Sequence, residues 1–154
     1  MPDGRCDAVS RLVKATAACL YRALTDRAQF ARWIAPEGAH ALIDCFDPRP
    51  GGSLEITLTF DRRGSGKTTS DTDRVKGCFL ELQKDRRVRQ AFIFESDDPA
   101  HAGTMIMTWV LTPAVDGTLV EVLAEDVPVG ISKEDHQAGM ESSLANLARL
   151  VETK

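Results

Sequence analysis

The chain is 154 residues long, with 43% hydrophobic and 27% charged residues, which fits one globular domain and excludes a disordered or fibrous chain. Nineteen basic and twenty-three acidic residues give a formal net charge of −4, so neither sign is concentrated enough to bind a nucleic acid backbone. No apolar run approaches the roughly 20 residues of a membrane span, and the first residues lack the apolar centre of a signal peptide. We therefore expect a single cytoplasmic domain over residues 1–154, with neither nucleic acid nor membrane as a partner.

The first part of the chain is predicted to be a strand followed by two short helices. Residues 8–15 mix apolar and polar positions with few turn formers, as an edge or half-buried strand does. Thr16 then stands where an N-cap opens a helix rich in Ala and Leu. Asp26 and Gln29 have the spacing of a capping box that opens a second helix.

The second helix carries a large apolar face. Phe30, Trp33 and Ile34 fall at positions i, i+3 and i+4, which share one side of a helix. Pro36 disfavours helical geometry at Ala35, so Trp33 lies in the last turn. Its ring must pack against whatever this helix covers, and we expect that to be a sheet.

The middle of the chain is predicted to be a run of antiparallel strands. Segments 39–47 and 53–60 flank a PRPGG turn, and apolar and polar residues alternate in the second segment. Turn-type sequences separate four further strands, at about residues 73–82, 87–95, 103–112 and 117–126. One face of the strand near residue 109 is apolar and consists of Met105, Met107, Trp109 and Leu111.

The last segment is predicted to be a long helix. Ser132 and Asp135 form the S-x-x-D pattern of a capping box. An apolar stripe then recurs at spacings of three and four residues, through His136, Met140, Leu144, Leu147 and Val151. Such a stripe needs a long concave partner, which a twisted sheet of about six strands provides.

This order of elements resembles the helix-grip fold of the START-like superfamily, over about residues 8–152. "LYRALTDRAQFARWIAP" resembles the opening motif of proteins similar to the C-terminal domain of the activator of the heat-shock protein 90 ATPase, and "FDPRPGGSLEI" resembles the next block of that family. Gly77, Gly117 with Thr118, and Gly139 match later positions. The resemblance implies an α+β fold, in which a curved antiparallel sheet of about six to seven strands wraps around a long C-terminal helix, with two short helices after the first strand.

Two positions depart from the family pattern. Ile34 stands where a second tryptophan is usual, and Gly139 is followed by Met140 where the family often has Gly-Trp. Both changes soften the inner wall of the expected cavity.

Other features of the sequence are weaker functional signals. Gly66, Lys67 and Thr68 imitate the end of a phosphate-binding loop, but Asp61 occupies the position of its first glycine, so we expect a hairpin loop. The acidic run 70–73 and the pair Arg86 and Arg87 are expected to be solvated. The four cysteines show neither metal-site nor disulfide spacing, so we expect free thiols, no metal and no cofactor.

Three functions fit the sequence. The first is noncatalytic binding of a small hydrophobic or amphipathic ligand between the sheet and the last helix. The second is a chaperone interaction of the heat-shock protein 90 activator type, and the third is an enzyme of the polyketide cyclase or hydratase type, with His136 as acid or base. An exposed edge strand also leaves room for a homodimer. The residues expected to line the cavity are Trp33, Phe79, Phe92, Met107, Trp109, Val122, His136, Met140 and Leu144.

Overall fold

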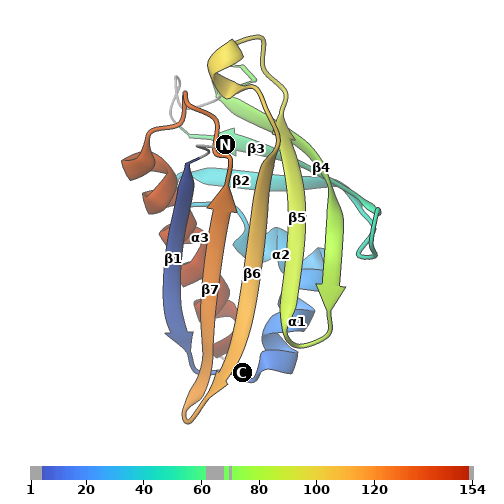
Figure 1. Ribbon diagram of the computed structural model, residues 1–154, viewed down its shortest axis with the longest axis vertical. Helices are drawn as coiled ribbons and strands as arrows, with labels where there is room; N and C mark the ends of the chain where they lie inside the picture. The colour runs from blue at the N-terminus through green and yellow to red at the C-terminus, as the bar shows by residue number, and fades with distance from the viewer. Residues whose placement is uncertain (1–4, 62–67, 70, 153–154) are drawn as a thin grey trace.

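The computed structural model describes residues 5–61, 68–69 and 71–152. Within them the elements follow the order β1 (Cys6–Val13), α1 (Ala17–Thr25), α2 (Arg27–Trp33), β2 (Ala39–Phe46), β3 (Ser53–Phe60), β4 (Thr72–Gln83), β5 (Arg87–Phe94), η1 (Pro99–His101), β6 (Met105–Ala114), β7 (Gly117–Glu125) and α3 (Lys133–Glu152) (Figure 1). The strands pair antiparallel in one sheet, in the order β1-β7-β6-β5-β4-β3-β2. This is the predicted α+β helix-grip fold, with seven strands.

The helices begin where the capping residues predict. The backbone N–H three residues further on donates to Thr16 Oγ1, Asp26 Oδ2 and Ser132 Oγ, at 3.0 to 3.1 Å. Each bond satisfies one of the N–H groups that a helix start leaves without an intrahelical partner. Local sequence therefore sets the start of all three α-helices.

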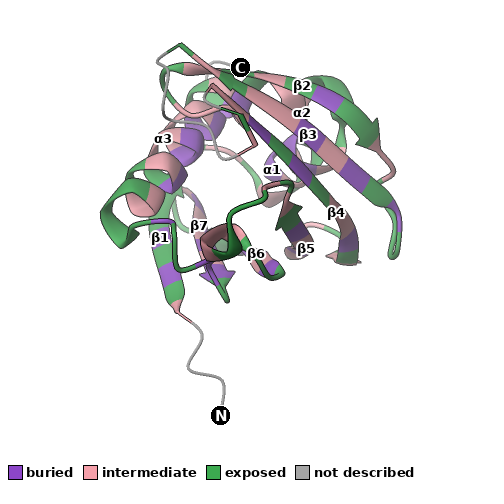
Figure 2. Ribbon diagram, turned by 90° about the horizontal axis from the view of Figure 1, so that it is seen from above, coloured by how far each residue is buried: buried purple, intermediate pink, exposed green. Residues whose placement is uncertain are grey.

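The sheet is strongly curved, and two irregular strands contribute to the curvature. The pairing register shifts between Ile43 and Cys45 in β2 and between Phe79 and Glu81 in β4. An extra residue in one strand of a pair bends that strand and increases its twist. Figure 2 shows the sheet curving around an interior that α3 and the two short helices flank.

The apolar stripe of α3 faces this interior. Met140, Leu144, Leu147 and Val151 are at most 6% exposed. The helix packs most closely on β1 and also meets α1 and α2. Over the described residues, no helix has the length and apolar character needed to span a membrane.

Two glycines of the family-like motifs stand where backbones approach closely. A Cβ atom at Gly52 would lie 2.0 Å from Asp47 O, and one at Gly77 would lie 1.8 Å from Ala91 O. Both distances are far below a nonbonded contact, so a larger residue would force the strands apart. These two motif positions therefore require glycine because neighbouring backbone leaves no room for a Cβ atom.

Candidate functional site

Trp33 packs against the concave face of the sheet, on Trp109 of β6. The ring centroids are 5.1 Å apart with an interplanar angle of 75°, an edge-to-face arrangement. The ring of Phe30 contacts Trp33 at the same centroid distance. Trp33 Nε1 donates to Ala23 O at 2.9 Å, so its polar atom is satisfied inside the core. The two tryptophans are 0% and 2% exposed and close this part of the interior.

Most residues predicted to line a cavity lie together in one buried core. This core contains Trp33, Phe79, Phe92, Trp109, Val122, Met140 and Leu144. Met107 is half-buried against the same core, and the side chain of His136 is 14% exposed. These side chains come from α2, α3 and four neighbouring strands.

The concave face is covered unequally along its length. Inward-facing Leu54 of β3 is 0% exposed, whereas Leu58, two inward positions further along the same strand, is half-buried. Phe94 of β5 and Met107 of β6 also take inward positions and remain half-buried. We call the region around the tryptophan pair the sealed end, and the region around Leu58 and Phe94 the open end. Met107 lies one inward position nearer the open end than Trp109.

One polar side chain lies on this face among apolar neighbours. Gln90 takes the inward position of β5 between Val88 and Phe92, and it is 1% exposed. Trp109 Nε1 donates to Gln90 Oε1 at 3.1 Å. Among the described residues, no atom accepts a hydrogen bond from Gln90 Nε2. The sequence analysis missed Gln90, although a glutamine at an inward position of "RVRQAFIF" was a detectable signal.

His136, the predicted acid or base, is held by a buried carboxylate. His136 Nδ1 lies 2.8 Å from Asp7 Oδ2, and the side chain of Asp7 is 0% exposed. Arg5 Nη2 donates to the same oxygen at 3.1 Å. The contact anchors the first turn of α3 to β1, and it also holds the imidazole in one orientation. No local spacing reveals it, because the two residues are 129 positions apart.

Two expectations about charged segments need correction. Asp73 of the acidic run is not in a solvated loop: it belongs to β4 and is 1% exposed. Arg87 begins β5, is half-buried, and pairs with Glu81 at 3.0 Å between Nε and Oε1. The imitation of a phosphate-binding loop lies outside the described residues, except for Thr68 and Thr69. The described part of the chain contains no cluster of three His, Cys, Asp or Glu suited to a metal ion.

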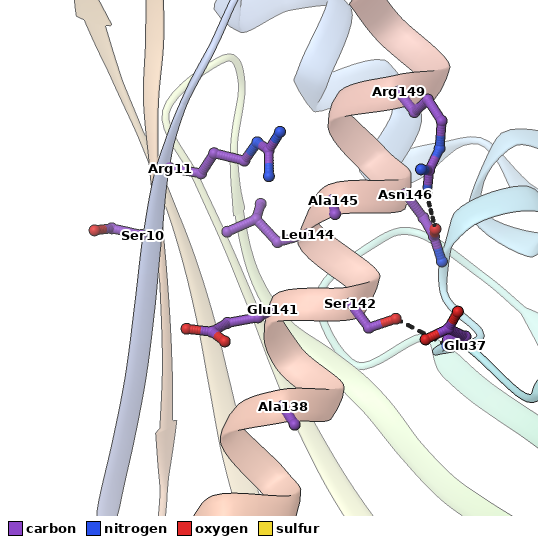
Figure 3. A pocket seen from close by; sticks show the side chains of 10 residues that line it. All are labelled: Ser10, Arg11, Glu37, Ala138, Glu141, Ser142, Leu144, Ala145, Asn146 and Arg149. Carbon is purple, nitrogen blue, oxygen red and sulfur yellow. Dashed lines mark hydrogen bonds between the residues drawn. The ribbon is translucent and has the colours of Figure 1, made fainter.

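A groove runs beside α3 on the surface. This groove has a volume of about 680 Å³ and is lined by Ser10, Arg11, Glu37, Ala138, Glu141, Ser142, Leu144, Ala145, Asn146 and Arg149. Figure 3 shows Arg11 and Glu141 reaching into the gap between β1 and α3. On the other flank of the helix, Glu37 N donates to Ser142 Oγ at 2.8 Å. Seven of the ten residues that line the groove are polar or charged, and Leu144 is the predicted site residue that borders it.

Known structures share this fold over nearly the whole chain. A protein from Chromobacterium violaceum has a TM-score of 0.84 and 28% identity, covering 96% of this chain and 98% of its own. A protein from Rhodobacter sphaeroides has a TM-score of 0.78 and 19% identity, covering 99% and 96%. The solution structure of an AHSA1-like protein from Aeromonas hydrophila has a TM-score of 0.72 and 18% identity, covering 97% and 93%.

Comparison with curated proteins finds no match. The sequence does match a family model, described as "Activator of Hsp90 ATPase homolog 1-like protein", over residues 14–152. That span includes every α-helix and all strands except β1. The chain therefore belongs to the family of Activator of Hsp90 ATPase homolog 1-like proteins.

Proposed function

We propose that this protein binds a small hydrophobic or amphipathic ligand between the curved sheet and α3, and that it does so without catalysis. One observation carries the proposal: apolar side chains that point inward at the open end are not fully covered. Leu58, Phe94 and Met107 are half-buried although they face the concave side of the sheet. Covering such surface is favourable by about 25 cal/mol per Å² of apolar area.

The side chains of the interior also suit an adaptable site. Met107 and Met140 face it from opposite sides, one from the sheet and one from α3. Methionine is unbranched and flexible, so it re-packs around ligands of different shape at low cost. The tryptophan pair at the sealed end provides a rigid aromatic surface against which a ligand can pack. A ligand therefore enters from the open end and stops at the tryptophans.

The test combines native mass spectrometry with thermal unfolding. Freshly purified protein is examined for a retained compound, and then screened with fatty acids, flavonoids and polyketide-like aromatics. A ligand that binds only the folded state raises the melting temperature in proportion to RT ln(1 + [L]/Kd). We expect Met107→Trp, which fills space next to the tryptophan pair, to abolish that rise. Leu42→Ala is the matched control, because Leu42 is 63% exposed on the other face of the sheet.

Two results would contradict the proposal. One is a protein that retains nothing and whose melting temperature responds to no compound. The other is a ligand whose effect survives Met107→Trp, which would place the site outside the interior. The family description then supports a chaperone interaction instead. Its test is whether the protein stimulates the ATPase activity of a heat-shock protein 90 chaperone.

A further inference from the structure

The amide of Gln90 is fixed in orientation inside the molecule. The indole nitrogen of Trp109 is a donor only, so the amide atom 3.1 Å away from it must be the oxygen. Trp109 in turn packs edge-to-face with Trp33, whose own N–H is bonded to Ala23 O. The oxygen of Gln90 therefore faces the tryptophans, and the NH₂ group faces away from them.

Gln90 itself lies on the open-end side of Trp109 in the sheet. Gln90 pairs across the sheet with Met107, one inward position nearer the open end than the pair of Val88 with Trp109. The next inward pair in that direction is Phe92 with Met105. Because the oxygen is turned to Trp109, the NH₂ group is turned away from Trp109, and the half-buried Met107 is the cross-strand neighbour of Gln90.

The NH₂ group is also an unmet donor. Gln90 is 1% exposed, and no atom of the described residues accepts from Nε2. A buried donor without a partner carries a desolvation penalty that an acceptor oxygen would relieve. Its sheet neighbours across and along the strands, Met107, Val88, Phe92 and Phe79, offer no oxygen or nitrogen acceptor in their side chains. The unmet donor is thus a single polar point within an apolar surface.

We propose that Gln90 is the specificity-determining residue of the interior site, and that the site selects neutral apolar molecules carrying one carbonyl oxygen, such as aryl ketones. This inference rests on the proposed function and adds the chemical class of the ligand. The ligand's carbonyl oxygen accepts from Nε2 while its apolar body covers the exposed part of Met107. A neutral oxygen fits better than a carboxylate, because a neutral amide does not compensate for burying a charge.

The experiment compares two probes of nearly the same shape. 2-Acetylnaphthalene carries a ketone, and 2-isopropenylnaphthalene replaces C=O by C=CH₂. Binding of each is measured by isothermal titration on the wild type and on Gln90→Met, which keeps the length of the side chain and removes both polar atoms. We expect the wild type to prefer the ketone by about tenfold, or about 1.4 kcal/mol. In Gln90→Met that preference falls to nearly one.

A second readout does not depend on the variant. The side-chain NH₂ signals of Gln90 in ¹⁵N-labelled wild-type protein, assigned by their loss in Gln90→Met, should move with the ketone and stay in place with the alkene. Equal binding of both probes to the wild type overturns the assignment of Gln90 but leaves an apolar site, as does a ketone preference that persists in Gln90→Met. If neither probe nor any compound of the screen binds, both proposals fail. A buried water that accepts the hydrogen bond of Nε2 and is not displaced would lead to equal binding of both probes to the wild type.

Discussion

The sealed end and the open end belong to the concave face of the same sheet, yet they differ in how far their side chains are covered. At the sealed end, α1 and α2 lay Leu20, Leu24, Phe30 and Trp33 onto the sheet, and all four side chains are 0% exposed. At the open end, the same strands carry Leu58 and Phe94, which are half-buried. A sheet face whose inward positions are mostly apolar, with Gln90 and Asp73 as polar exceptions, therefore serves as core at one end and is partly accessible at the other. What differs is the helices that cover it.

The largest expected effect is at the sealed end. Trp33→Ala removes the ring that contacts both Phe30 and Trp109, and we expect it to lower the free energy of unfolding by about 3–5 kcal/mol. Urea denaturation followed by circular dichroism measures the change. Val115→Ala, at a fully exposed position, is the control and should stay within about 0.5 kcal/mol of the wild type. A loss below 1 kcal/mol for Trp33→Ala would mean that this end is not tightly packed.

A matched pair on one strand sharpens the comparison. Leu54 and Leu58 face the same side of β3, but only Leu54 is completely buried. Leu54→Ala should destabilise the protein by about 2–5 kcal/mol, because it loses transfer energy and leaves a cavity. Leu58→Ala should cost about 1 kcal/mol, because that side chain is only partly removed from water. Equal losses in the same urea experiment would show that the two positions on β3 are packed alike.

The smallest expected effect on stability comes from Glu81, which lies on the outer face of the sheet. The pKa of Glu81 is lowered from its usual value of 4.5, first by the hydrogen bond from Gln83 and then by Arg87. A lowered folded-state pKa gives stability that is present above the unfolded pKa and is lost as pH falls through the folded one. Glu81→Gln should therefore slightly lower the melting temperature at pH 7 and leave it unchanged in acid. A difference that grows as pH falls would reverse this sign and contradict the assignment.

Much of the fold was predictable because its signals are local. The three capping residues Thr16, Asp26 and Ser132 act within three positions of themselves, and the alternation in β3 repeats every second residue. The site was less predictable. The inward side chains were identified from alternation, but the partner of Gln90 lies 19 positions away and depends on the register of β5 with β6. The burial of Asp73 was missed because an acidic run is usually solvated.

The sequence by itself determined the elements, their order and the inward face of most strands, because hydrophobic periodicity and helix caps act over a few residues. Only the tertiary structure decided which end of the concave face is sealed, that Trp33 contacts Trp109, and that Asp7 holds His136. Those contacts join residues far apart in the chain and exist only when the sheet has curved and the helices have packed. The same packing buried one glutamine of β5 with its oxygen bonded to Trp109 and its NH₂ group without an acceptor among the described residues.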